Sequence, residues 1–322
     1  MAHDPAQLRA RRAEARAQAA RRRRGLALAG LGLVVAVVAV IAAASALGGG
    51  GGGGDASPAA QRSVPEASAG GPAAPSGAAA LPAAVPASAP GAHRGADEAV
   101  PILMYHVIST PPAGAPYPEL YVSGRDFAAQ MGKLRALGYH AITQQQLWDA
   151  WHRGGLLPAK PVVISFDDGY QGVYKRALPV LRKLRWPGVV NLEVRVLGQP
   201  EQGGLTPAMV RGLVKAGWEI DSHTINHVDL TKVSSETART ELAASRARIR
   251  ALFKVPANFF CYPAGKYDPA VEDLVRQAGY LAATTVDPGL ARKEEPYALK
   301  RVRIDGSDGV GGFAQKLQQA AA

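Results

Sequence analysis

From Val100 onward, apolar runs of strand length alternate with segments whose apolar residues recur at helical spacing. This alternation is typical of α/β proteins, in which helices connect parallel strands. The run KPVVISF at 160–166 is the clearest strand, and the segment 126–138 is a typical amphipathic helix. About seven strand and helix pairs are too many for a small open sheet. We therefore expect an α/β fold, a distorted (β/α) barrel with about seven strands.

The expected elements can be read in order along the chain. Strands are expected at 100–106, 139–143, 160–166, 189–194, 218–223, 258–263, 280–286 and 299–304. Helices are expected at 126–138, 144–154, 173–184, 206–217, 234–253 and 268–279. Thr206 is the expected N-cap of its helix because Pro207 suits the first helical position.

The formal net charge of +11 would suggest a nucleic-acid partner if it were spread over a folded surface. Much of the excess instead precedes residue 25. The arginines there are Arg9, Arg11, Arg12, Arg16 and Arg21 to Arg24. No nucleic-acid partner is therefore expected.

The segment Gly25–Leu47 contains 23 uncharged, mostly apolar residues. At about 1.5 Å per residue it can cross a hydrocarbon core of roughly 30 Å as a transmembrane helix. A cleaved signal peptide is the alternative, because Ala44–Ala46 resembles a cleavage site, although such an apolar region is usually only about 7–15 residues long. The arginines before the span should stay in the cytoplasm. The prediction is a single-pass protein of the cytoplasmic membrane whose folded domain faces the periplasm or the cell exterior.

Residues 48–98 consist almost entirely of Gly, Ala, Pro and Ser and open with seven glycines. Such a segment cannot bury enough apolar surface to offset its chain entropy, so a disordered linker is expected. The predicted domains are a basic cytoplasmic tail at 1–24, the transmembrane helix at 25–47, this linker, and a folded domain at 99–322.

Polar residues follow the expected strands at the edge where barrel active sites form. Asp167 and Asp168 come directly after the strand at 160–166. Two buried carboxylates need a compensating positive charge, and a metal ion supplies one. Because neighbouring side chains point in different directions, one aspartate can bind the metal while the other acts as a base. A plain helix cap is the alternative for an isolated Asp-Asp-Gly.

His223 and His227 follow the strand at 218–223. On a helical turn, residues four apart lie on one face, so both imidazoles could reach one ion. Two histidines and a carboxylate form a three-ligand set that leaves positions open for water and substrate. One divalent ion is expected, with zinc favoured and cobalt or nickel as alternatives.

Three segments resemble the motifs of the polysaccharide deacetylases, the NodB-homology enzymes of carbohydrate esterase family 4. They are FDDGY at 166–170, SHTINH at 222–227 and FFCYPAGKYD at 259–268. The segments VPILMYHVI at 100–108 and LKRVRI at 299–304 also look like this family, and within it like the membrane-attached poly-N-acetylglucosamine-type deacetylases. The resemblance covers essentially the whole domain and implies its barrel fold.

The resemblance also implies roles for individual residues. Asp167 would be the general base, and Asp168, His223 and His227 the metal ligands. The backbone N–H of Tyr262 would stabilise the oxyanion, with Pro263 fixing the turn.

This sequence departs from the family at two positions. Many members carry an arginine in the third motif that orients the base, and Cys261 occupies that place here. As the only cysteine of the chain, Cys261 cannot form an intrachain disulfide, and a packing role is favoured over metal binding. Many members also carry a histidine in the last motif that protonates the leaving amine, but LKRVRIDG contains none.

Three further residues are candidates for the site. His106 ends the first expected strand and should point into the mouth of the barrel, as a catalytic acid or a structural histidine. Tyr170 could stack on a sugar ring of the substrate. Asp287 follows another strand and could contribute to substrate binding, although Asp-Pro-Gly is equally a plain turn.

The predicted function is metal-dependent hydrolysis of N-acetyl groups on an extracytoplasmic polysaccharide, such as poly-N-acetylglucosamine, a chitin-like polymer or the peptidoglycan glycan. Hydrolysis of O-acetyl esters, as on xylan, uses the same elements and remains an alternative. An inactive glycan-binding protein that retains its metal is an alternative of another class. The acetylated polysaccharide and the membrane are the expected partners.

Overall fold

The computed structural model describes residues 91–200 and 203–321. The predicted tail, transmembrane helix and most of the linker lie outside this range. No helix within the described ranges is long and apolar enough to cross a membrane. The described structure starts ahead of the predicted domain boundary at residue 99, because β1 (His93–Arg94) pairs antiparallel with β6 (Leu156–Leu157).

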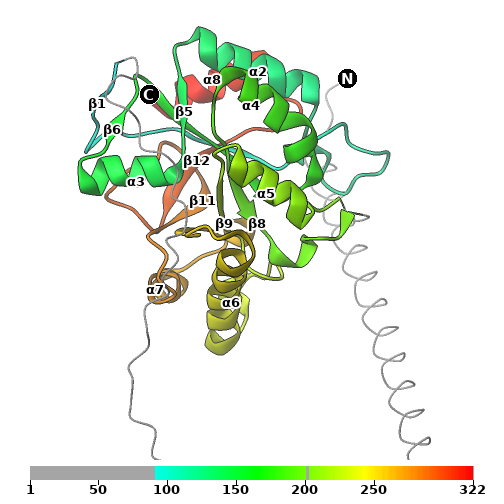
Figure 1. Cartoon of the computed structure of the whole chain (residues 1–322), viewed down its shortest axis with the longest axis vertical. Coiled ribbons are helices and arrows are strands. Elements are labelled where there is room, and N and C mark those ends of the chain that lie inside the picture. The colour runs from blue at the N-terminus through cyan, green and yellow to red at the C-terminus, as the bar shows by residue number, and fades with distance from the viewer. Residues whose placement is uncertain (1–90, 201–202, 322) are drawn as a thin grey trace, which may run out of the picture. The chain divides into compact units, whose positions relative to one another are not determined.

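Seven parallel strands form a closed ring with helices packed around it (Figure 1). The ring closes where β12 pairs with β2 at Val302 and Leu103, and where β2 pairs with β7 at Leu103 and Ile164. The predicted seven-stranded barrel is therefore confirmed. In spatial order the strands are β2 (Ile102–Tyr105), β12 (Leu299–Arg303), β11 (Ala282–Pro288), β10 (Phe259–Cys261), β9 (Glu219–Ser222), β8 (Val189–Leu192) and β7 (Pro161–Asp168).

The other strands lie outside the ring. The strand predicted at 139–143 is present as β5 (His140–Ile142), which pairs in parallel with the first residues of β7. A small parallel pair, β3 (Val107–Ile108) and β4 (Tyr121–Val122), follows β2.

Every helix predicted within residues 99–322 is present. The longer helices are α2 (Gly124–Ala136), α3 (Gln144–Arg153), α4 (Leu178–Leu184), α5 (Pro207–Lys215), α6 (Ser235–Phe253), α7 (Pro269–Gln277) and α8 (Gly309–Ala321). The predicted cap of α5 is confirmed, because the Thr206 side chain accepts a hydrogen bond from the Met209 N–H at 3.2 Å. Single turns of 3-10 helix lie at η1 (Pro118–Leu120), η3 (Val194–Val196), η5 (Leu230–Lys232) and η6 (Pro263–Gly265).

The helix predicted at 173–184 is irregular, and one helix was missed. Its first part, η2 (Val173–Ala177), is π-helical and α4 follows. Pro179 explains the wide turn, because it has no N–H to donate to the preceding turn and its ring crowds that turn. Helix α8 was not predicted because glycines at 309, 311 and 312 weaken its helical signal.

Alternate residues of the ring strands face inward and outward. At one end the interior is apolar, where Ile102, Val163 and Phe259 pack against Leu147 and Trp151 of α3. Two residues further along these strands, towards their carboxyl ends, the inward positions become polar. They include Ser165, Asp167, Asn191, Asp221 and Arg301, all buried. The barrel therefore places its polar groups at the edge where the predicted site lies.

Candidate metal centre and its neighbours

Asp168 ends β7 with a left-handed backbone, φ 70°. Its Oδ1 atom lies 3.4 Å from Nε2 of His223 and 3.5 Å from Nε2 of His227. This Oδ1 is buried and accepts no hydrogen bond. An unsatisfied carboxylate oxygen facing two imidazole nitrogens is costly unless a cation lies between them.

Each ligand of this group is held in place by the fold. The Nδ1 atom of His223 lies 2.7 Å from the carbonyl oxygen of Cys261, which directs Nε2 towards Asp168. Such a hydrogen bond fixes the tautomer of a metal-binding histidine. The N–H of His227 donates to Oγ1 of Thr224 at 2.9 Å.

The segment between the two histidines is not the helical turn that the sequence suggested. Thr224 and His227 have left-handed backbones, with φ values of 66° and 53°. Glu241 of α6 accepts the N–H groups of Ile225 and Asn226 at 2.8 and 3.0 Å, which closes this segment as a tight loop. The two imidazoles nevertheless meet, with ring centroids 4.8 Å apart.

The distances from Asp168 Oδ1 to the two imidazole nitrogens suit a tetrahedral divalent ion. Bonds of about 2.0–2.2 Å at a tetrahedral angle place neighbouring ligand atoms about 3.4 Å apart. The distances from Asp168 to the two histidines match this value. Asp168, His223 and His227 therefore fit a zinc-like ion with a free coordination position.

A second group, Asp167, His223 and Cys261, also brings three ligand atoms together. The guanidinium of Arg301 already contacts two of these residues, with Nη2 lying 2.9 Å from Asp167 Oδ2 and 3.3 Å from Cys261 Sγ. A fixed cation at this place excludes a second one by charge repulsion. The first group is therefore the better candidate.

Asp167 is surrounded by donors. Nη1 and Nη2 of Arg301 each donate a hydrogen bond of 2.9 Å to the Asp167 carboxylate. Nδ2 of Asn191 donates another to Asp167 Oδ1 at 2.8 Å. Burial alone would raise the pKa of Asp167, but the charge of Arg301 and the neighbouring His106 outweigh it, so the pKa lies well below its ordinary value. Asp167 is therefore an oriented, ionised carboxylate beside the candidate metal centre.

His106 lies in the mouth of the barrel, as the sequence predicted. Its Nε2 atom is 3.7 Å from Asp167 Oδ2, while its Nδ1 atom is buried without a hydrogen-bond partner. Burial lowers the pKa of His106 below its ordinary value, although Asp167 and Asp168 act in the opposite direction. A protonated imidazole here would thus be a strong acid next to the base.

The structure corrects the proposed oxyanion donor. The N–H of Tyr262 donates to the Thr284 carbonyl at 3.1 Å, because β10 and β11 pair in parallel up to this point. It cannot also bind an oxyanion. Pro263 has no N–H, so Ala264 is the next donor, and its N–H makes no hydrogen bond in the described structure. Its left-handed backbone, φ 51°, makes Ala264 part of a tight turn.

The predicted substrate-binding residues differ in their surroundings. Tyr170 is half-buried beside the centre, and burial followed by the charge of Asp168 raises the pKa of its hydroxyl. Pro263 is buried and starts η6. Asp287 accepts a hydrogen bond from the Tyr267 hydroxyl at 2.7 Å. Within the described residues, it forms no hydrogen bond or ion pair with Asp168, His223 or His227.

Sequence reasoning missed Arg301 and Asn191. Both occupy inward positions of ring strands, two residues after the apolar Leu299 and Val189. The sequence LKRVRI could have indicated Arg301. If its side chains alternate strictly and Leu299 faces inward, Arg301 also lies inside the barrel, where a buried arginine needs an acidic partner.

Comparisons with known proteins agree with this site. Residues 155–283 match the family model described as polysaccharide deacetylase. The chain is 31% identical to the Bacillus subtilis protein YxkH, whose name assigns it to the polysaccharide deacetylases, over 67% of this chain and 74% of that protein. It is 28% identical to the poly-beta-1,6-N-acetyl-D-glucosamine N-deacetylase of Escherichia coli, over 58% of this chain, and spans only 34% of that protein.

Solved structures give the same result. The Bacillus cereus polysaccharide deacetylase BC0361 is similar with a TM-score of 0.61 and 28% identity, covering 69% of this chain and 69% of that one. The barrel, the convergence of Asp168 with two histidines, and these similarities lead to one assignment. This chain belongs to the polysaccharide deacetylase family.

Proposed function

We propose that this enzyme removes N-acetyl groups from a poly-N-acetylglucosamine-type polysaccharide outside the cytoplasmic membrane. The observation that carries the proposal is the meeting of Asp168, His223 and His227 beside an arginine-bound Asp167. The name of the Escherichia coli relative supports this choice of substrate class.

Asp168, His223 and His227 would hold one divalent ion, for which zinc is our first choice and cobalt or nickel the alternatives. An ion at this place lowers the pKa of a bound water and polarises the acetyl carbonyl. His223 keeps its tautomer through its hydrogen bond to the Cys261 carbonyl, so Nε2 stays available.

Asp167 would act as the general base. Arg301 and Asn191 fix both of its oxygens in position, so the carboxylate needs no reorientation to accept a proton. A low pKa makes Asp167 a weak base in the resting state, and a bound metal would compensate for this by lowering the pKa of the attacking water.

Ala264 and His106 would complete the reaction. The free N–H of Ala264 would stabilise the tetrahedral oxyanion. His106 lies close enough to Asp167 to receive the abstracted proton and deliver it to the leaving amine. An amine leaves poorly without a proton, so a histidine at this place favours amide cleavage over ester cleavage.

We further propose that Gly25–Leu47 anchors the chain in the cytoplasmic membrane as a single pass, with residues 1–24 in the cytoplasm. Cleavage after this segment would instead release the enzyme. Protease protection of a C-terminal tag in intact cells, together with the mass of the mature N-terminus, distinguishes the two forms.

The reaction is tested by measuring acetate release from poly-N-acetylglucosamine, chitooligosaccharides and acetylated xylan. The enzyme is first treated with a chelator and then supplied with zinc, cobalt or nickel. We expect release from the N-acetylated polymers only after metal is restored, and none from the Asp167→Asn variant. Release from xylan alone would replace the proposal with the esterase, and glycan binding without any release would replace it with an inactive binding protein.

A further inference from the structure

The outer surface of η2, α4 and α5 carries a strong positive charge. We call this surface the α4–α5 basic face. From residue 169 to 192 the chain has five cationic residues and no acidic one, and α5 adds two cations without an acid. All seven are exposed, and none forms an ion pair within the part of the chain that the structure describes. They are Lys175, Arg176, Arg182, Lys183, Arg185, Arg211 and Lys215.

Cations elsewhere on the domain are paired more often. Arg153 pairs with Asp149, Arg276 with Asp273, and Lys316 with both Asp305 and Asp308. Helix α7 has an acidic first turn. Helices α5 and α6 lie between α4 and α7 in the order around the ring. The α4–α5 basic face differs from these parts of the domain because its cations have no acidic partners among the described residues.

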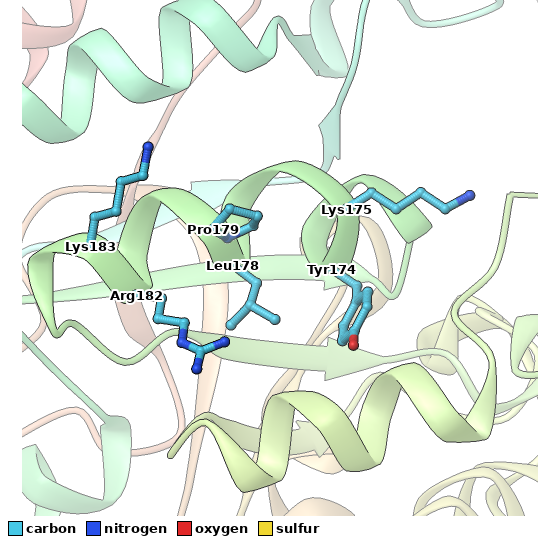
Figure 2. Close-up of a pocket in the computed structure, with 6 residues that line it drawn as sticks. All are labelled: Tyr174, Lys175, Leu178, Pro179, Arg182 and Lys183. Atoms are coloured by element: carbon cyan, nitrogen blue, oxygen red, sulfur yellow. The ribbon is translucent and has the colours of Figure 1, made fainter.

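A hollow of about 650 Å³ lies within the basic face (Figure 2). Lys175 and Lys183 extend at its two ends, and Arg182 points from the opposite side of α4. Tyr174, Leu178 and Pro179 supply apolar surface between the cations (Figure 2). Two neighbouring hollows have volumes of about 400 and 390 Å³. The first shares Arg182 with the 650 Å³ hollow and the second shares Lys183 with it, while Arg185 lines both of the neighbouring hollows.

We propose that the α4–α5 basic face docks on the surface of a bilayer that contains anionic phospholipids. Unpaired lysines and arginines attract the phosphate groups of such lipids. The apolar side chains between them suit the glycerol and upper acyl region that lies next to the phosphates. A fully hydrophilic anionic polymer has nothing that matches this apolar surface, so a lipid is favoured.

The charge also excludes the enzyme's own product from this face. Each deacetylation of the proposed substrate leaves an amine that is protonated near neutral pH, so the product is a cationic chain. The basic face repels it. The docking proposal rests on the proposed membrane-attached placement but not on the proposed reaction.

The test uses the full chain reconstituted into vesicles of phosphatidylcholine alone or of an equal mixture with phosphatidylglycerol. An environment-sensitive fluorophore is attached to Pro179→Cys, in the hollow, or to Gln277→Cys, on α7. The native Cys261 is fully buried and does not compete for the label. We expect contact with a lipid-borne quencher at Pro179→Cys only in the anionic vesicles, and no change at Gln277→Cys.

A charge-matched pair of variants identifies the residues responsible. Lys175→Gln, Arg182→Gln and Lys183→Gln together remove three cations from the basic face. Because each cation near an anionic surface strengthens binding about fivefold, we expect the docked state to weaken about a hundredfold. Arg239→Gln, Arg248→Gln and Arg250→Gln remove the same charge from exposed positions of α6 and should leave docking unchanged.

Two results would overturn the proposal. One is equal quenching in both kinds of vesicle; the other is unchanged quenching in the basic-face variant. A response to a soluble anionic polysaccharide but not to anionic vesicles would assign the face to that polymer instead. Quenching should disappear at 1 M salt, where the screening length is about 3 Å. Acetate release from a soluble chitooligosaccharide, measured in parallel, separates failure of docking from failure of the proposed reaction.

Discussion

Arg301 binds Asp167 through two parallel hydrogen bonds, with Nη1 2.9 Å from Oδ1 and Nη2 2.9 Å from Oδ2. Both residues are buried, and they come from strands β12 and β7 on either side of β2. Arg301 thus does what the resemblance leads us to expect from an arginine in the third motif, where this chain has Cys261. The thiol of Cys261 accepts a further hydrogen bond from the same guanidinium at 3.3 Å.

Arg301→Lys should lower kcat about a hundredfold with little change in KM, because an ammonium cannot hold both oxygens of Asp167 at once. The measurement is steady-state acetate release from a chitooligosaccharide. Arg303→Lys on the same strand, where the side chain pairs with Asp305 near the surface, is the matched control and should stay near wild type. Wild-type kcat in Arg301→Lys would show that the orientation of the base does not limit the reaction.

A chelator should abolish activity, and zinc should restore it. His227→Gln should weaken zinc affinity by more than about 100-fold, since even loss of a hydrogen bond behind a ligand costs about 10–100-fold. Added zinc should also raise the melting temperature of the wild type, because it binds only the folded state, but not that of the variant. His152→Gln, an exposed histidine of α3, is the control. Equal zinc stabilisation of His227→Gln and wild type would contradict the assigned ligand.

His106→Gln should slow amide hydrolysis about 10²- to 10⁴-fold while leaving an activated aryl acetate almost unaffected. The reason is that only the amine needs a proton in order to leave. Both substrates are measured on the same preparation, so a misfolded variant is recognised by loss of both activities. Parallel loss of ester and amide cleavage in a folded variant would assign His106 a positioning role.

Glu219 and Asp221 form a buried pair of acids at the inner face of β9, where burial raises the pKa of Glu219 well above its ordinary value and that of Asp221 to about 7. The folded state therefore keeps a proton that the unfolded chain loses near pH 4. Between these values the folded state binds more protons, so its stability should fall as pH rises, by about 1.4 kcal/mol per pH unit for each proton retained.

This pH dependence is measured by urea unfolding from pH 5 to 8. Asp221→Asn should flatten the decline, because the amide cannot ionise and the buried Oε1 of Gln144, which has no hydrogen-bond partner, can accept from it. The same slope in wild type and variant would mean that other groups cause the decline.

Local sequence patterns were sufficient for the barrel and for the convergence of Asp168, His223 and His227, because parallel strands bring their carboxyl ends to one edge. They were insufficient where a partner comes from a distant strand. Arg301 is separated from Asp167 by 134 residues. The N–H of Tyr262 is a second example. Its hydrogen bond to the Thr284 carbonyl depends on the pairing of β10 with β11, so the sequence alone could not show that this N–H is unavailable to an oxyanion.

The closure of the ring by β2 and β12 has a consequence for how the enzyme becomes active. These strands lie near opposite ends of the folded domain, and Arg303 of one pairs with Met104 of the other. Contacts of such long sequence separation form late and slow the folding of a chain. Because Arg301 lies on β12, a chain that emerges amino end first has its metal ligands available before its base is oriented. Catalytic competence should therefore arrive in the last step of folding, when β12 closes the ring on β2.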